Sequence, residues 1–271
     1  MTMTTANPET WIGEGPVLLD YADHVARITL NRPDAANGMN IEFMKALHEA
    51  VMRCHREPDV RVVLLRGAGK HFCAGGDVRE FASKGEGLGD FLREVTAWLQ
   101  MAIGALIRLD AVVVAQVQGY AAGGGLGLVC AADIVVAAQG ARFLAGATRV
   151  GMAPDAGSSV ILPHLIGFRR AMEMMLSNRT VGADEALEMG LVNQVVADAE
   201  LDESAARLAA TYAAGAPLAQ AATKRLLWNT LQVERALPEE ARTVSTLSAT
   251  ADSREGLAAV IGKRQPVFRR H

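Results

Sequence analysis

One segment, residues 112–138, constrains the fold most, because a short apolar run enters a glycine cluster and a second apolar run leaves it. The β-branched run 112–117 predicts a buried strand. Glycine frees the backbone from Cβ sterics over residues 119–125, and residues 126–131 predict a helix. The segment therefore predicts a strand, a loop and a helix N-terminus, whose free amides favour an anion or a polarised carbonyl.

This glycine cluster has two other interpretations. A tight turn that needs small residues for packing alone is the structural alternative. A dinucleotide-binding fingerprint is disfavoured, because Leu128 stands where the third glycine would follow Gly123 and Gly125. No acidic residue follows at the required distance either.

Composition narrows the class of protein. Half of the 271 residues are apolar, which is enough to bury one large α/β core or a core with a small appendage. The net charge of −3, without a basic stripe, disfavours nucleic acid and membrane surfaces and favours a small-molecule partner. Three cysteines without metal-ligand spacing to the histidines indicate a reducing compartment and no metal site. Because the N-terminus does not resemble a signal peptide, a cytoplasmic protein is expected.

Strands alternate with helices over the first two thirds of the chain, which predicts parallel βαβ units. Residues 1–10 are polar and expected to be loose, residues 17–20 and 25–30 predict a hairpin, and Asn40 is a candidate N-cap for a helix over 41–56. Alanine-rich helices are predicted at 203–213, 217–231, 238–248 and 253–263. The predicted organisation is a core of residues 1–200 and a C-terminal helical region of residues 201–271, packed on the core or on a neighbouring subunit.

A second glycine loop, residues 71–77, follows the predicted strand 60–67. If the amides of Gly76 and Gly124 converge, they would bind one oxygen, and each donor would contribute about 3 kcal/mol when charge develops there. A simple turn is the alternative for residues 74–76.

Asp155 lies between Pro154 and an Ala-Gly pair in an apolar neighbourhood. It is either a helix N-cap or a base, because burial raises the pKa of a carboxyl group. A hydrolytic triad with His164 and Ser158 or Ser159 is disfavoured, since no nucleophile elbow is present.

Together these features resemble the crotonase (enoyl-CoA hydratase/isomerase) superfamily. The motifs that carry the resemblance, in family order, are Asn31-Arg32-Pro33, residues 72–77, 119–125 and 132–134, and the closing segment 254–264. The resemblance implies an α/β fold, a crotonase-like spiral of ββα units with a C-terminal helical region that builds trimers or dimers of trimers. It also implies an acyl-coenzyme A thioester as the substrate, with no separate cofactor.

The resemblance also implies roles for individual residues. Gly76 and Gly124 would supply the two oxyanion amides, and Ala74 would lie by the adenine. Gly75, Asp77 and Gly123 would bind substrate in the same loops, and Lys263 would reach a coenzyme phosphate across a subunit boundary. Residues 81–92 and the helix after them are expected to wall the acyl pocket, whose acyl group stays open.

Departures from the family pattern bear on the reaction. Hydratases of the family carry two glutamates, which would fall at Gly127 and Ala147, and neither residue here can move a proton. The segment around Asp155 is similar to the ring-epoxide isomerases of the phenylacetate pathway and to related enoyl-CoA isomerases, whose aspartate is the acid/base. Dehalogenases of the family also use this aspartate, but their tryptophan and histidine would fall at Ala147 and Gln100.

These observations favour an acyl-CoA isomerase in which Asp155 moves a proton. A 2-enoyl-CoA hydratase with water held by Asp155 is the first alternative. The second is a catalytically silent acyl-CoA-binding or RNA-associated homologue, which the Pro154-Asp155 pair and the lack of a basic helix disfavour.

Overall fold

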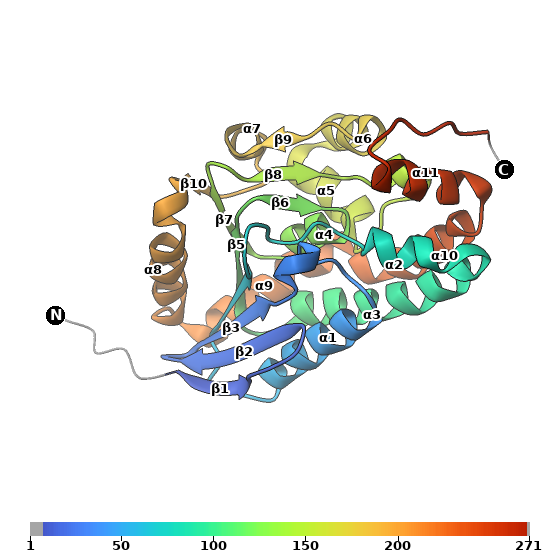
Figure 1. The fold of residues 1–271 in the computed structure, drawn as a ribbon. Helices are drawn as coiled ribbons and strands as arrows, with labels where there is room; N and C mark the ends of the chain where they lie inside the picture. Colours follow the sequence, from blue (N-terminus) through green and yellow to red (C-terminus); the bar gives the residue numbers. More distant parts are fainter. Residues whose placement is uncertain (1–7, 270–271) are drawn as a thin grey trace.

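The computed structural model describes residues 8–269, and its framework is a mostly parallel seven-stranded sheet in the order β1-β2-β3-β4-β5-β7-β10 (Figure 1). A second sheet has the order β6-β8-β9. The strands are β1 (Glu9–Ile12), β2 (Val17–Ala22), β3 (Val25–Leu30), β4 (Val62–Gly67), β5 (Val112–Val117), β6 (Tyr120–Ala122), β7 (Ile134–Ala138), β8 (Arg142–Leu144), β9 (Val181–Gly182) and β10 (Gln194–Val196). The helices are α1 (Ile41–His55), α2 (Val78–Ser83), α3 (Leu88–Arg108), α4 (Gly124–Cys130), α5 (Ser158–Ile166), α6 (Phe168–Ser177), α7 (Ala183–Met189), α8 (Leu201–Ala213), α9 (Pro217–Leu231), α10 (Val233–Ser248) and α11 (Ala251–Ile261).

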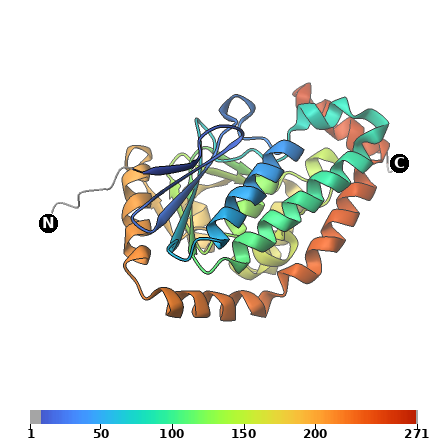
Figure 2. The same ribbon diagram turned by 90° about the horizontal axis from the view of Figure 1, so that it is seen from below.

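Both faces of the parallel strands are covered, as Figure 2 shows with α8 on one side of the large sheet and α1 and α3 on the other. Val62 and Leu64 pack toward α8, whereas Val63 and Leu65 belong to the core on the α1 side. Successive side chains of a strand point to opposite faces, so both sets must be apolar. This requirement explains the unbroken apolar runs in the sequence.

The α/β class and most predicted elements are confirmed, and Asn40 caps α1 by accepting a hydrogen bond from the amide of Phe43. The predicted loose tail is wrong at Glu9 and Thr10, which pair with β2; residues 1–7 lie outside the described range. The predicted loop 119–125 contains β6, because β8 supplies a pairing partner from further along the chain.

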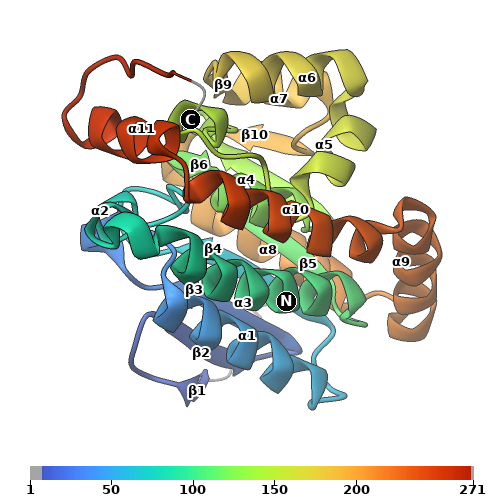
Figure 3. The same cartoon turned by 90° about the vertical axis from the view of Figure 1, so that its right-hand side faces the viewer.

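Helix α10 begins at Val233, five residues earlier than predicted. Val233 and Leu237 are both buried, so packing stabilises the additional turn although Pro238 lies inside the helix. Figure 3 shows α10 alongside α3 and α11 beside α2. The division at residue 200 and the role of residues 201–271 in oligomerisation stay predictions.

None of the helices within residues 8–269 combines the length and the apolar character needed to cross a membrane.

A buried ion pair fastens α9 to the central sheet. The ammonium of Lys224 lies 2.8 Å from Asp133 Oδ2, and its side chain is 6% exposed. Lys224 also donates hydrogen bonds to two backbone carbonyls, and Trp228 Nε1 donates to Asp133 Oδ1 at 2.7 Å. Because this carboxylate meets donors from two turns of α9, it holds the C-terminal helices on the core.

Replacing Lys224 with alanine should lower the free energy of unfolding by about 3–5 kcal/mol, because Asp133 would remain as a buried charge without its cation. Urea denaturation measures the change. The control is Lys45→Ala, which breaks an exposed pair with Glu94 and should cost less than about 1 kcal/mol. Equal losses in the two variants would contradict the assigned role of Lys224.

Candidate active site

A cavity of about 180 Å³ opens where the two glycine loops meet. Six of the eight predicted site residues line it: Ala74, Gly75, Gly76, Gly123, Gly124 and Asp155. The far wall comes from α2 and α3 through Phe81, Leu92, Val95 and Leu99, within the region predicted to form it. The structure thus brings residues from three separate segments of the sequence to one apolar cavity.

Backbone hydrogen bonds join the two loops. The amide of Cys73 donates to Tyr120 O at 3.0 Å, and the amide of Ala122 donates to Cys73 O at 2.9 Å. Gly75 has φ +91°, and a Cβ there would lie 2.8 Å from Ala122 O. Glycine is therefore required at position 75 both for the backbone conformation and for the close approach.

Two amides remain available in this cavity. The amide of Met39 donates to Gly75 O at 2.8 Å, and the carbonyl of Met39 accepts from the amide of Asp77 at 2.9 Å. Gly76 lies between these two residues, and its own N–H takes part in neither hydrogen bond. Gly124 is the first residue of α4, where an amide has no partner within the helix. No hydrogen bond among residues 8–269 uses either N–H, so both donors can serve a ligand oxygen.

Asp155 is not the cap of α5, so that interpretation of it is wrong. The helix starts after Gly157, which has φ +75°, and no side chain caps it from that position. The carboxylate of Glu240, from α10, instead accepts from the amides of Gly157 at 2.7 Å and Ser159 at 3.0 Å. The Asp155 carboxyl group is therefore left to the cavity that it lines.

The surroundings of Asp155 make it a base suited to neutral pH. Burial, and after it the negative charge of Glu240, together raise the pKa of Asp155 to about 7. Among the described residues that line the cavity, Arg149 carries the one other charged side chain. A carboxylate with this pKa can both take and return a proton near pH 7.

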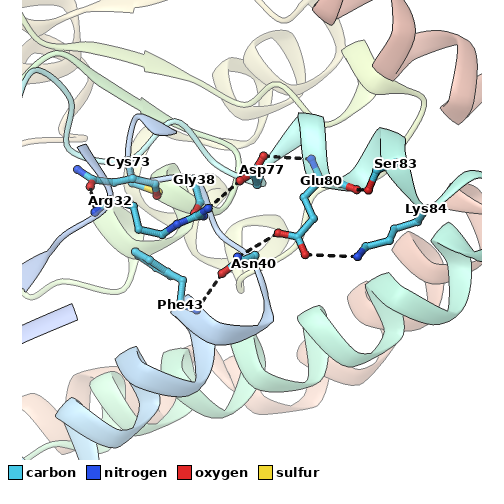
Figure 4. A network of polar contacts seen from close by, with 10 residues as sticks. Arg32, Gly38, Asn40, Phe43, Cys73, Asp77, Glu80, Ser83 and Lys84 are labelled. Atoms are coloured by element: carbon cyan, nitrogen blue, oxygen red, sulfur yellow. Dashed lines mark hydrogen bonds and ion pairs between the residues drawn. The ribbon is translucent and has the colours of Figure 1, made fainter. Parts of the chain in front are cut away.

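The structure does not bring Asp77 and Lys263 into the cavity. Asp77 caps α2 by accepting from the amide of Glu80 at 3.2 Å, and it forms an ion pair with Arg32 at 3.0 Å (Figure 4). These contacts fix the backbone beside Gly76. Lys263 follows α11 as an exposed residue. Direct substrate contacts by Asp77 and Lys263 stay predictions.

Glu240 and the part of the cavity wall formed by the C-terminal helices were not among the residues predicted from the sequence. Val244, Leu257 and Val260 of this chain line the cavity. A signal was present, because Leu237, Glu240 and Val244 share one face of a helix and a glutamate on an apolar stripe is unusual.

The resemblance to the family places the two glutamates of hydratases at Gly127 and Ala147, and neither residue has a side chain that can donate a proton. Ala147 lines the cavity, whereas Gly127 packs against the loop that carries Asp155. A Cβ at Gly127 would lie 2.2 Å from the Cβ of Ala156, so the present loop conformation excludes any side chain there.

Comparisons with known proteins find relatives over almost the whole chain. The profile of the family described as "Enoyl-CoA hydratase/isomerase" matches residues 20–271. The chain is 39% identical to a probable enoyl-CoA hydratase of Rhodobacter capsulatus, covering 92% of this chain and 96% of that protein. It is 34% identical to the 1,2-epoxyphenylacetyl-CoA isomerase of Escherichia coli, covering 90% and 94%.

A solved structure confirms the predicted crotonase-like fold. The enoyl-CoA hydratase from Mycobacterium avium subsp. paratuberculosis superposes with a TM-score of 0.87 at 29% identity, covering 95% of this chain and all of that one.

The raised pKa of Asp155 makes its ionisation unfavourable to folding. In the unfolded chain Asp155 loses its proton near pH 4, whereas in the folded protein it keeps the proton up to about pH 7. The free energy of unfolding therefore falls as the pH rises from about 4 to about 7. Asp155→Asn should therefore raise the free energy of unfolding at pH 8 by up to about 4 kcal/mol, with the gain vanishing toward pH 4. Urea denaturation at both pH values measures this difference. Asp34→Asn, at an exposed position, is the control, and equal behaviour of the two variants would contradict the raised pKa of Asp155.

Proposed function

Because the chain belongs to the enoyl-CoA hydratase/isomerase family, we propose that it is an acyl-CoA isomerase that shifts a double bond or rearranges a ring epoxide through a thioester enolate. The observation that carries the proposal is that Asp155 supplies the one carboxylate among the described residues lining the cavity, beside the free amides of Gly76 and Gly124. The similarity to the 1,2-epoxyphenylacetyl-CoA isomerase supports it.

In the double-bond reaction, the thioester oxygen accepts hydrogen bonds from Gly76 and Gly124. Asp155 removes a proton from a carbon of the acyl group, and the electron pair delocalises onto the thioester oxygen as an enolate. The two amides stabilise the charge that develops there. Asp155, now protonated, returns the proton to another carbon of the conjugated system. One group performs both proton transfers, so a single carboxylate is sufficient.

The coenzyme is proposed to lie along the loops that bear Ala74, Gly75 and Gly123, with Lys263 toward a phosphate. The apolar walls from α2, α3, α10 and α11 suit an acyl group with few polar atoms. The thioester is the substrate, and its transformation by proton transfer requires no further cofactor in this proposal.

A 2-enoyl-CoA hydratase is the second candidate, because relatives such as the Rhodobacter capsulatus protein carry that name. Hydration requires one group to activate water and another to protonate carbon. The space at Gly127 is occupied by Ala156, and Ala147 has no ionisable group. Asp155 would have to serve both steps alone, which makes isomerisation the better fit to the site.

Asp155→Asn should retain acyl-CoA binding and reduce isomerisation of 3-enoyl-CoA or ring-epoxide substrates by at least about 100-fold, because the proton acceptor is lost. Spectrophotometric turnover measures the rate, and calorimetric titration measures binding. In the unaltered protein, kcat should rise with pH through about 7, where Asp155 becomes the carboxylate. Retained turnover in the variant would rule out the proposed mechanism.

Hydration of crotonyl-CoA by the unaltered protein separates the two candidate reactions. We expect its rate to lie far below that of isomerisation. A hydration rate equal to or above the isomerisation rate would favour the hydratase.

Homo-oligomerisation is also proposed, from apolar side chains on the outer surface. Leu226 and Leu227 of α9 are 71% and 65% exposed, and Phe168 of α6 is 69% exposed. Leu226 and Leu227 are neighbours on α9, and adjacent large apolar side chains that are exposed commonly mark an interface.

Light scattering after size-exclusion chromatography should give a mass three or six times the 28.7 kDa of one chain. The double variant L226E/L227E should shift the mass toward one chain, because it places charges in the interface. A monomeric unaltered protein would contradict the oligomer.

A further inference from the structure

Glu240 is a buried acid without a cationic partner. It is 6% exposed and takes part in no ion pair among residues 8–269. Its carboxylate oxygens accept from the amides of Gly157 and Ser159, and the Ser159 hydroxyl donates to Oε1. These donors and the positive end of α5 stabilise a negative charge inside the protein.

The segment anchored by Glu240 is the one that carries Asp155. Ala156 and Gly157 both adopt left-handed φ values, +57° and +75°, and the amide of Ser158 donates to Asp155 O at 3.0 Å. A left-handed alanine is unfavourable unless surrounding contacts impose it. A Cβ at Gly157 would lie 2.9 Å from Val233 Cγ1, so α10 packs directly on this turn. The three hydrogen bonds from Gly157 and Ser159 to Glu240 therefore fix the turn that places Asp155 at the cavity.

We propose that Glu240 is a positioning residue for Asp155, which it serves by anchoring the turn of residues 155–159 from α10 and by placing a fixed negative charge behind the base. This inference rests on the proposed function of Asp155. A fixed charge here favours the protonated form of Asp155, which is the form that exists while the enolate is present. It also contributes to the raised pKa of Asp155.

Few other charges can act on Asp155. Arg149 lines the same cavity, and the thiol of Cys130 on α4 stays neutral because burial raises its pKa to about 12. The other charged or titratable side chains on α5, α6 and α10 are exposed. They are His164 of α5, then Arg169, Arg170 and Glu173 of α6, and Glu234, Arg235, Glu239 and Arg242 of α10. Among residues 8–269, Glu240 is thus the one buried acid on the helices that pack around Asp155.

The test is Glu240→Gln, which removes the charge and keeps one acceptor oxygen for the turn, although it loses one of the two amide hydrogen bonds. Carbon-13 NMR of the aspartate carboxyl groups, with Asp155→Asn to assign the signal, should show the titration midpoint of Asp155 moving to lower pH by about one unit. The acid limb of kcat should move with it, and kcat on its plateau should fall about tenfold because the base is weaker, with KM nearly unchanged.

Glu239→Gln is the matched control, because it removes the same charge from the neighbouring exposed position of α10. It should change neither the titration midpoint of Asp155 nor kcat. Glu240→Asp keeps the charge but shortens the reach, so it should reduce kcat without lowering the midpoint to that of Glu240→Gln. An Asp155 midpoint in Glu240→Gln that coincides with the unaltered protein would overturn the proposal, even if stability falls. The NMR titration needs no turnover, so failure of the isomerase assignment would be seen separately.

Discussion

The close approach of two glycine loops is the constraint on which the site depends. Backbone hydrogen bonds between Cys73 and the strand β6 hold the two loops in direct contact. A Cβ at Gly125 would lie 2.2 Å from Cys73 O, so this packing excludes larger residues. The result is a pair of unused amides, at Gly76 and Gly124, at the edge of one cavity. Rigid backbone donors of this kind stabilise a developing oxyanion without reorganisation.

The C-terminal helices form the remaining wall of the cavity that the two glycine loops line. Helices α10 and α11 close the cavity with Val244, Leu257 and Val260, and the resulting apolar surroundings raise the pKa of Asp155. The buried Lys224–Asp133 pair holds the preceding helix on the central sheet. Stability and the site are therefore coupled, because the helices that these contacts hold in place also form an apolar wall of the cavity that Asp155 lines.

Membership of the enoyl-CoA hydratase/isomerase family is established, and the isomerisation that we propose rests on how this chain fills the space around Asp155. The Cβ of Ala156 lies where a side chain at Gly127 would begin. A turn with two successive left-handed residues thus excludes one glutamate of the hydratase pattern and presents an aspartate instead. The absence of a carboxylate at position 127 and the presence of one at Asp155 are the physical basis of the proposed isomerisation.

The sequence by itself determined the α/β class and the N-cap at Asn40, and it marked Gly76, Gly124 and Asp155 as candidate site residues, because strand alternation, capping and glycine clusters are local signals. Only the tertiary structure decided that Asp155 is free while Glu240 caps α5, since that contact joins positions more than 80 residues apart. It likewise decided that β6 forms within the glycine cluster, since its partner β8 comes later in the chain. A glutamate on the apolar face of α10 can be seen in the sequence, but its partner cannot, because hydrogen bonds between distant segments leave no pattern that pairs the two segments.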